Sequence, residues 1–341
     1  MYHFDSDYME GAHPKVLQRL IETNMVQTPG YGTDYYCKSA KEKIRKACSS
    51  PNAEVHFLVG GTQTNTTVIK AILRPFQGVI APDTGHINVF EAGTVEAGGH
   101  KILTLPNQDG KISAAQVLDY MNIFNRDGDH NHMVHPGMVY ISHPTEQGTL
   151  YSKDELEKLS DVCKENNLPL FLDGARLGYG LTAKGSDVSI ETIAKNCDVF
   201  YIGGTKVGAL FGEAVVITND DLIDNLPTII KQQGGLLAKG RLLGVQFDTL
   251  FTDNLYLDVA KRGTEMAEKL KNGFAEKGYE FYSESPTNQQ FIILANKKKE
   301  ELAKEVTFGF WRRVDEDHTA VRFVTSWGTR DEDIEQLIEL L

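Results

Sequence analysis

The sequence predicts an α/β protein with a large domain on a mostly parallel sheet and a small α+β domain at the C-terminal end. Three observations support this fold class. Its 341 residues are too many for one compact core. Short apolar runs alternate with helical stretches between about residues 50 and 220, which is the rhythm of a parallel sheet with helical crossovers. Long helical patterns and two strand-like runs, FIILAN and VRFVTSW, follow after about residue 222.

The alternating region contains a series of apolar runs that we interpret as strands. In chain order they are HFLVGG, GVIAP, HKILTLP, MVYISH, LPLFLD, DVFYIGG and AVVI. Helices are expected to begin at Thr62, near Val89 and after Ser152, where SKDE forms a capping box. Because parallel sheets bind ligands at the carboxyl ends of their strands, the functional residues should lie there.

Composition and charge exclude several classes of protein. A formal net charge of −12 disfavours nucleic-acid binding. No apolar run approaches the length of a membrane helix, and the N-terminal residues do not resemble a secretory signal. Four separated cysteines form no CxxC pair, so we expect reduced thiols and a cytoplasmic location. The histidines of HNHMVH lack acidic or cysteine partners, so no metal is expected.

The first candidate site is the glycine pair Gly60 and Gly61, between a strand and the helix expected from Thr62. Free N–H groups at a helix N-terminus, with no Cβ nearby, can form a cup for a phosphate group. A tight turn is the simpler alternative. The segment is not a GxxxxGK[ST] loop, so a phosphate ester suits it better than a nucleoside triphosphate.

Two charged residues follow later strands. Asp173 ends the LPLFLD run, and Lys206 follows DVFYIGG among glycines. Each alone could be a turn residue or a solvated loop residue. A phosphate cup, an aspartate and a lysine in this order are what pyridoxal phosphate requires, namely an anchor, a carboxylate for the ring nitrogen and an amine for the Schiff base.

At this point the chain resembles a known family. The segments SDYMEGAHPKVL, GYGTD, GGTQTN, HINVFEAG, HPTEQGTLYS, LDGARL, GGTKVGAL and VRFVTSW occur in the order typical of threonine aldolases. These are fold-type I pyridoxal-phosphate enzymes of the β-eliminating lyase superfamily, and the resemblance covers nearly the whole chain. It implies a transferase-like cofactor-binding domain at 16–240, a small domain at 241–341, and an arm at 1–15 packing with the small domain.

The resemblance also implies roles for residues around the cofactor. Lys206 would form the Schiff base, and Asp173 would bind the ring nitrogen. Gly61, Thr62 and the Thr205 hydroxyl would hold the phosphate. Thr205 stands where many relatives have serine, so the hydroxyl is kept.

Further residues are implied on the substrate side. His86 would stack on the pyridine ring, although it could instead be a histidine satisfied in a turn. Arg176, with Ser6 and Arg322, would bind the substrate carboxylate, and Arg176 would also lie beside the cofactor. Tyr31 would reach the site from a neighbouring subunit. The SDTVT segment usual in the family is replaced here by SDY at residues 6–8. The match therefore supports the carboxylate contact of Ser6 less strongly than those of the other residues.

Two implied assignments concern loops. His132 matches a second active-site histidine near the substrate hydroxyl. Lys239 and Arg241 resemble a basic pair that contacts phosphate across a dimer interface, and either could equally be a solvated helix charge. The resemblance therefore implies a homodimer or homotetramer with its active site between subunits.

The function expected from this reading is cleavage of a β-hydroxy-α-amino acid, L-threonine or L-allo-threonine, to glycine and acetaldehyde. His86, His132 or a water held by them would remove the hydroxyl proton. A β-eliminating lyase or an aminotransferase would use the same lysine and aspartate. A non-catalytic protein that binds a phosphorylated metabolite is the alternative from another class.

Overall fold

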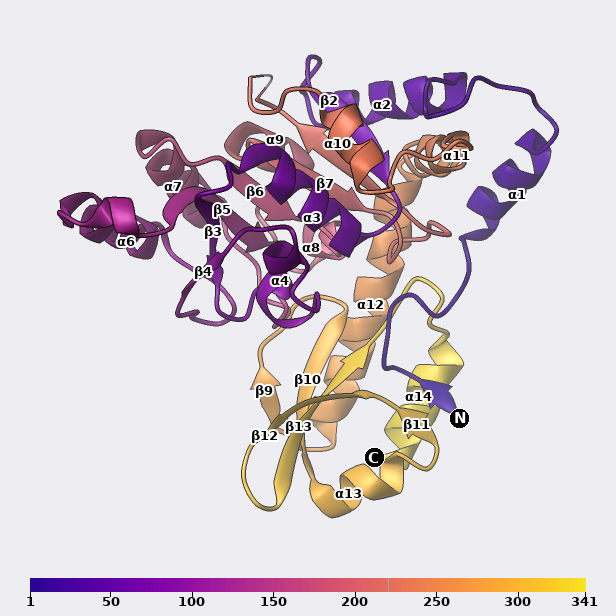
Figure 1. The fold of residues 1–341 in the computed structure, drawn as a ribbon. Helices are drawn as coiled ribbons and strands as arrows, with labels where there is room; N and C mark the ends of the chain where they lie inside the picture. The colour runs from indigo at the N-terminus through magenta and orange to yellow at the C-terminus, as the bar shows by residue number, and fades with distance from the viewer. Residues whose placement is uncertain (220) are drawn as a thin grey trace.

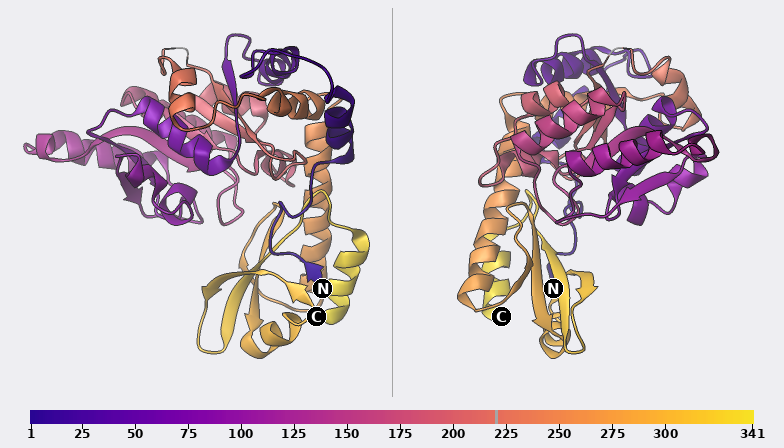
Figure 2. Two further views of the ribbon diagram at one scale, coloured as in Figure 1. Left: turned by 45° about the vertical axis from the view of Figure 1, so that its right-hand side comes forward. Right: turned by 90° about the vertical axis from the view of Figure 1, so that its left-hand side faces the viewer.

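The computed structural model describes residues 1–219 and 221–341, which form two bodies. The larger body is a seven-stranded sheet with helices on both faces, and the smaller one holds a four-stranded sheet (Figure 1). Helix α12 (Leu255–Glu276) runs from the larger body to the smaller one, as both views of Figure 2 show. In the described part of the chain, no helix has the length and apolar character needed to cross a membrane.

The strands of the large sheet lie in the order β2-β8-β7-β6-β5-β3-β4. Their bounds are β2 (Glu54–Leu58), β3 (Gln77–Pro82), β4 (Ile102–Leu105), β5 (His135–Ser142), β6 (Leu170–Asp173), β7 (Val199–Gly203) and β8 (Glu213–Ile217). All pairings from β4 across to β7 are parallel, whereas β8 is antiparallel to both of its neighbours. The mostly parallel α/β sheet predicted from the sequence is therefore confirmed.

Successive side chains of a strand point to opposite faces of the sheet, so they lie alternately in two separate hydrophobic cores. On β5, Val139 and Ile141 lie in one core and Met138 and Tyr140 in the other. The second core is covered by α3 (Gly61–Ile72), α4 (His86–Val89), α5 (Thr94–Ala97) and α10 (Leu226–Gln232). The first is covered by α2 (Tyr35–Ala47), α6 (Ala114–Arg126), α7 (Lys153–Glu165), α8 (Leu177–Thr182), α9 (Ile190–Asn196) and α11 (Arg241–Leu250).

The predicted capping box determines where α7 begins. The Ser152 hydroxyl accepts a hydrogen bond from the Glu155 N–H at 3.2 Å, and the Glu155 carboxylate accepts one from the Ser152 N–H at 2.8 Å. Without these two bonds, the backbone N–H groups of Ser152 and Glu155 would lack a hydrogen-bond partner at the start of the helix. The helices expected at Thr62 and near Val89 are α3 and α4, with the first beginning one residue earlier, at Gly61.

The smaller body is an antiparallel sheet in the order β12-β13-β10-β9. Its elements are β9 (Phe281–Ser283), β10 (Gln289–Ala295), β12 (Gly309–Arg313), β13 (His318–Val324), α13 (Asn296–Leu302) and α14 (Asp331–Leu340). The N-terminal strand β1 (Tyr2–His3) pairs with β11 (Val306–Thr307), and Phe4 lies in the core of this body. The division at residues 15 and 240 stays a prediction.

Candidate active site

The carboxylate of Asp173 lies at the end of β6, buried under four hydrogen-bond donors. One oxygen accepts from the Tyr201 hydroxyl at 2.5 Å and the Ala175 N–H at 3.0 Å. The other accepts from the Tyr140 hydroxyl at 2.7 Å and the Asn65 amide at 2.9 Å. Burial alone would raise the pKa of Asp173, but the charge of His86 and these donors more than offset it, and the pKa lies below its usual value. Asp173 is therefore an ionised carboxylate inside the protein.

The glycine pair lies directly beside this carboxylate. A Cβ on Gly61 would come within 3.0 Å of the Tyr201 hydroxyl, the same hydroxyl that binds Asp173, whereas a Cβ on Gly60 would meet nothing within 4 Å. Gly61 and Thr62 open α3, whose first N–H groups have no acceptor inside the helix. Thr62 is exposed. The structure thus brings the expected phosphate cup next to Asp173.

Lys206 lies in the turn between β7 and β8 and is half-buried. Burial and the nearby charge of Arg176 lower its pKa to about 8, while the charges of Asp7, Asp173 and Glu213 act in the opposite direction. An amine with this pKa is available as a nucleophile near neutral pH. Since β6 and β7 are neighbours in the sheet, the structure brings Asp173 and Lys206 to the same edge.

The single proton of the Thr205 hydroxyl is already donated within the protein. It donates to the Glu213 carboxylate at 2.8 Å and accepts from the Gly212 N–H at 2.9 Å. Glu213 is buried and also accepts from the Gly204 N–H at 3.0 Å. Thr205 therefore shapes the turn around Lys206, and donating a hydrogen bond to the phosphate, as expected, would require its bond to Glu213 to open.

Arg176, the residue before α8, forms a buried ion pair with Asp7 of the N-terminal segment. Its Nε donates at 2.7 Å and a terminal nitrogen donates at 3.1 Å to the two carboxylate oxygens. Asn288 donates to the same carboxylate at 2.9 Å. Burial acts to raise the pKa of Asp7, but Arg176 and Lys206 outweigh it and the pKa is lowered.

Arg322, on β13, forms no ion pair of the kind that Arg176 forms with Asp7 among the described residues. One terminal nitrogen donates to the Gln289 side-chain oxygen at 3.2 Å. Among the described residues, the buried Arg322 Nε, Ser6 Oγ and Gln289 Nε2 have no hydrogen-bond partner. Burial and the charge of Arg176 lower the pKa of Arg322 to about 10, so it stays a cation at neutral pH. The unpaired nitrogens of Arg322 and Gln289, two neighbouring side chains, are donors from which a carboxylate could accept hydrogen bonds.

His86 opens α4 close to Asp173, and its Nδ1 lies 2.7 Å from the Glu91 carboxylate. Its backbone N–H donates to Glu146 at 2.9 Å. The His86 side chain is 34% exposed, whereas the Glu91 side chain is completely buried. His86 therefore lies near Asp173 with a partly exposed imidazole, and its role at the cofactor ring and the substrate stays a prediction.

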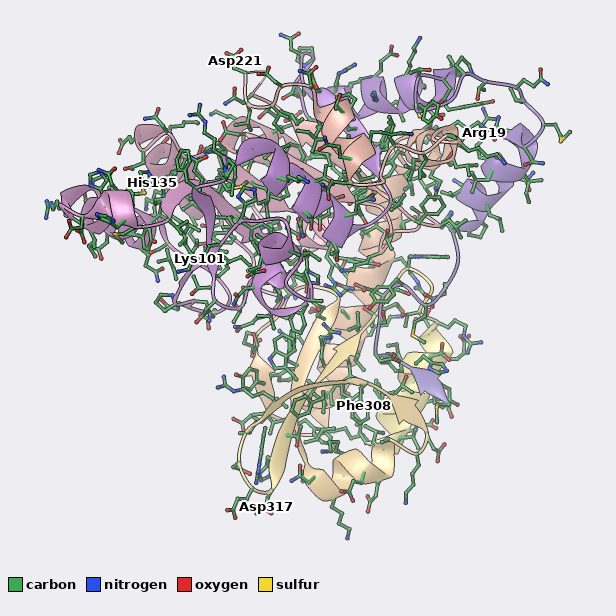
Figure 3. The ribbon with its side chains drawn as sticks, in the orientation of Figure 1. Arg19, Lys101, His135, Asp221, Phe308 and Asp317 are labelled. Carbon is green, nitrogen blue, oxygen red and sulfur yellow. The ribbon has the colours of Figure 1, made fainter. Side chains whose placement is uncertain are left out.

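The structure does not bring His132 to this group. His132 lies in a short 3-10 turn (His130–His132) before the first residue of β5 and is exposed. Figure 3 shows His135, where β5 begins, beside α6 at the outer end of the larger body. The eight residues of β5 span about 26 Å. His132 is thus at the amino edge of the sheet, opposite Asp173, because the strand separates them.

The residues assigned to a neighbouring subunit lie on the surface of this chain. Tyr31 is half-exposed with Lys231 4.9 Å above its ring, and Lys239 is exposed. Arg241 instead donates to the backbone oxygens of Thr23 and Asn24 at 2.8 and 3.0 Å, at the end of α1 (Pro14–Thr23). None of them contacts Lys206 within the described chain, so their roles stay predictions.

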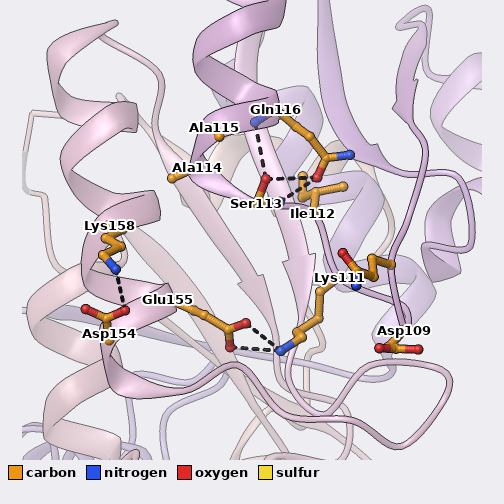
Figure 4. Close-up of a pocket in the computed structure, with 11 residues that line it drawn as sticks. Asp109, Lys111, Ile112, Ser113, Ala114, Ala115, Gln116, Asp154, Glu155 and Lys158 are labelled. Atoms are coloured by element: carbon orange, nitrogen blue, oxygen red, sulfur yellow. Dashed lines mark hydrogen bonds and ion pairs between the residues drawn. The ribbon is translucent and has the colours of Figure 1, made fainter.

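A separate hollow of about 380 Å³ lies between α6 and α7. Its two lysines are paired with acids, Lys111 with Glu155 and Lys158 with Asp154, both at 2.6 Å (Figure 4). None of the residues that line it belongs to the group around Asp173 and Lys206. We therefore place the candidate site at the carboxyl edge of the sheet and not in this hollow.

The arrangement can be compared with known proteins. The family model described as beta-eliminating lyase matches residues 3–297. The chain belongs to the beta-eliminating lyase family. Its cofactor is pyridoxal phosphate, in agreement with the expectation from the sequence.

Individual relatives are also similar to this chain over nearly their whole length. The low specificity L-threonine aldolase of Pseudomonas aeruginosa is 29% identical over 99% of this chain and 95% of its own. The solved structure of Leishmania major threonine aldolase is 42% identical, covers 100% of this chain and 98% of its own, and has a TM-score of 0.96. Thermus thermophilus aspartate aminotransferase, at 14% identity and a TM-score of 0.70, shows the shared fold alone.

Several residues of the site were not predicted from the sequence: Asp7, Asn65, Tyr140, Tyr201 and Glu213. Tyr140 and Tyr201 lie inside apolar runs, where tyrosine is counted as a core residue. Asn65 gave a usable signal, because it follows Gly61 by four residues and so shares its face of α3.

Proposed function

We propose that this chain is a pyridoxal-phosphate-dependent aldehyde-lyase that cleaves L-threonine or L-allo-threonine to glycine and acetaldehyde. The observation that carries the proposal is the placement of Asp173 and Lys206. One is a buried carboxylate with a lowered pKa and the other an amine whose pKa is lowered to about 8, at the ends of neighbouring strands. Similarity to proteins described as threonine aldolases supports the choice of substrate.

The residues of the site fit pyridoxal phosphate. An ionised carboxylate away from water requires a positive partner, and a protonated pyridine nitrogen would provide one for Asp173. Lys206 would hold the aldehyde carbon, and the first turn of α3, at Gly61 and Thr62, would hold the phosphate. The bound cofactor supplies a cationic ring that accepts the electrons of a breaking bond to Cα.

Side chains on the other side of the site would bind the amino acid. Arg322, with Ser6 and Gln289, offers unpaired donors for the α-carboxylate, and a guanidinium can bind a carboxylate through two parallel hydrogen bonds. Tyr8 lies nearby, with its ring centre 6.0 Å from Lys206 Nζ. Fixing the carboxylate sets the orientation of the bonds at Cα.

His86 would accept the proton of the β-hydroxyl group. As that proton leaves, the Cα–Cβ bond breaks, acetaldehyde departs and Cα later takes up a proton to give glycine. An imidazole can accept and return a proton near neutral pH, which suits this role. Because the structure does not bring His132 to the site, we assign the base to His86.

Two measurements test this function. The protein is incubated with L-threonine, L-allo-threonine and L-serine, and the products are assayed; we expect an aldehyde, whereas a keto acid would indicate elimination or transamination. The purified protein should also be yellow and lose its colour on borohydride reduction, with the label on Lys206. Lys206→Ala should abolish turnover, whereas Lys195→Ala, an exposed lysine on α9, should not. A protein that binds no pyridoxal phosphate would be a metabolite-binding protein instead.

We also propose that the protein is at least a dimer, a homodimer or a homotetramer, with Tyr31 and Lys239 completing the site of a neighbouring copy. An apolar groove between α1 and α11 supports this, because Leu17, Ile21 and Leu210 along it are 47, 62 and 47% exposed. Exposed apolar patches of this kind are typical of protein interfaces.

A cytoplasmic location is proposed from the thiols. The cysteines Cys37, Cys48, Cys163 and Cys197 are all buried and unpaired. Unpaired thiols are typical of reducing compartments. Fractionation of cells that express the protein, with antibody detection, tests this location.

A further inference from the structure

Behind His86 lies a buried acid that the reaction described above does not use. Glu91 Oε1 is 2.7 Å from Nδ1 of His86. Oε1 also accepts a hydrogen bond from the Asn65 amide at 2.7 Å, and the Thr94 hydroxyl lies 3.4 Å from Oε2. The Glu91 side chain has no exposed surface, so its contacts are all within the protein.

Asn65 links this acid to the carboxylate of the cofactor site. Its amide nitrogen has two protons, one for Glu91 at 2.7 Å and one for Asp173 at 2.9 Å. A single neutral amide thus donates to both carboxylates and holds each of them in place.

The charged and titratable groups around His86 come from several elements. Glu91 follows α4, Asp173 ends β6, and Glu146 follows β5 and accepts the His86 backbone N–H. The other oxygen of Glu146 is buried and unpartnered among the described residues. Asp173 is assigned to the ring nitrogen in the proposed function, so Glu91 is the acid that contacts the imidazole itself.

We propose that Glu91 is a positioning residue for His86: its carboxylate accepts the Nδ1–H hydrogen bond and thereby leaves the Nε2 lone pair facing the substrate as the acceptor of the β-hydroxyl proton. This inference rests on the proposed function. Among the described residues the only hydrogen bond of the ring is the one at Nδ1, so Nε2 has no partner there, and the side chain is partly exposed. Glu91 touches neither substrate nor cofactor and acts only through His86.

The chemistry of the two partners explains the assignment. An ionised carboxylate only accepts hydrogen bonds, so the imidazole nitrogen facing Glu91 must carry the proton. In a neutral imidazole the lone pair is then on the other nitrogen. When Nε2 takes the substrate proton, Glu91 stabilises the imidazolium that forms, as the aspartate of a Ser-His-Asp triad does. Glu91 therefore fixes both the tautomer and the orientation of the base.

The first test is the kinetics of Glu91→Gln in the holoenzyme. We expect kcat for threonine cleavage to fall by about 10- to 100-fold, with KM changed by less than about threefold because the carboxylate-binding residues are untouched. The acid limb of the kcat profile should move to lower pH, because the imidazolium loses its negative partner. Glu96→Gln is the matched control, since it removes the same charge from an exposed position on α5.

The second test observes His86 directly. Holoenzyme labelled with ¹⁵N-histidine is examined by NMR, and the His86 signals are assigned by their absence in His86→Asn. The wild type at alkaline pH should show a protonated Nδ1 and an unprotonated Nε2, and Glu91→Gln should lose this preference. Unchanged tautomer and pH profile in a folded Glu91→Gln variant would overturn the proposal.

A further variant keeps the test decisive if Glu91→Gln fails to fold. Glu91→Asp retains the charge but withdraws it by one methylene group, so its kcat should fall between those of the wild type and the glutamine variant. Wild-type kcat in Glu91→Asp would contradict the positioning role. A wild-type protein that cleaves no β-hydroxy-α-amino acid would instead refute the proposed function, and the NMR measurement would still decide whether Glu91 fixes the tautomer.

Discussion

The guanidinium of Arg176 donates two hydrogen bonds to the carboxylate of Asp7, at 2.7 and 3.1 Å, in a buried ion pair. The positive charge of Arg176 is therefore balanced inside the protein. Arg322 makes no ion pair with any described carboxylate, and its Nε is unpartnered. Of the two arginines that the resemblance assigns to the substrate, we infer that Arg322 binds the carboxylate and Arg176 fixes the N-terminal segment beside it.

Asp7→Asn should destabilise the protein by about 3 kcal/mol at pH 7, because an amide leaves Arg176 as an unbalanced buried charge. The pKa of Asp7 is below its usual 3.8 in the folded state. Its contribution is thus fully present above the pKa of the unfolded chain and is lost as the pH falls through the folded value. Urea unfolding at pH 7 and pH 3 should show a difference between variant and wild type that shrinks at pH 3.

The matched control for this experiment is Asp109→Asn, an exposed aspartate with a positive φ that asparagine also tolerates. It should change the free energy of unfolding little at either pH. A constant difference between wild type and Asp7→Asn at both pH values would show that the Asp7 charge does not stabilise the fold.

The sequence predicted the sheet well because its strands are local signals. Each of the seven runs is apolar, bounded by polar or glycine residues, and followed by a helix or a turn. The same local logic placed Asp173 and Lys206 at strand ends. A buried strand cannot hold an unpaired charge, so a charge at its carboxyl end indicates the edge of the sheet.

The remaining residues depend on contacts between distant parts of the chain. Asp7 and Arg176 are 169 residues apart, and Asn65 and Asp173 are 108 apart. No periodicity or spacing in the sequence indicates that two such distant residues are in contact. His132 shows a different difficulty. A resemblance can match a loop histidine to a site residue, although His132 lies before the first residue of β5 and therefore at the edge of the sheet opposite the site.

Asp173→Asn should bind cofactor but lower kcat by about 100-fold, which is about 2.7 kcal/mol of lost stabilisation. A neutral amide fits the space, yet it cannot keep a pyridine nitrogen protonated. Visible absorbance measures cofactor content, and the rate of acetaldehyde formation measures turnover. Normal turnover at full cofactor content would contradict the role of Asp173.

The amine of Lys206 should titrate near pH 8 once the cofactor has been removed. Its pKa is lowered to about 8 from an ordinary value of 10.5, mainly by burial and then by Arg176. Because only the neutral amine reacts, acylation of Lys206 should rise with pH and reach half its maximal rate near pH 8, as followed by peptide mass spectrometry. Exposed Lys158, whose pKa Asp154 raises, provides the internal comparison and should react at higher pH. A Lys206 midpoint above pH 10 would refute the prediction.

Ile21→Glu should convert an active dimer into an inactive monomer, because it places a charge in the apolar groove between α1 and α11. Sedimentation velocity measures the assembly, and threonine cleavage is assayed on the same sample. Ile123→Glu is the control, since Ile123 on α6 is 61% exposed and Ile21 is 62% exposed. A fully active monomer would contradict a site shared between subunits.

The final prediction concerns Arg322, which alternates on β13 with the buried Val321 and Phe323. Arg322→Lys should raise KM for threonine and lower kcat, each by about tenfold or more, because an ammonium cannot bind a carboxylate through two parallel hydrogen bonds. Misplacing the carboxylate also misaligns the Cα–Cβ bond, which explains the effect on kcat. Binding of the cofactor should remain normal, as judged by visible absorbance, because Arg322 is assigned to the substrate alone.

Comparison with two other arginines makes the Arg322 test specific. Arg313→Lys changes an exposed arginine of the same sheet and should leave the kinetic constants unchanged. Arg176→Lys should lower stability more than Arg322→Lys does, because it disturbs the ion pair with Asp7. If Arg322→Ala cleaves threonine with wild-type KM and kcat, the carboxylate does not bind at Arg322, and Arg176 would have to release Asp7 in order to bind it.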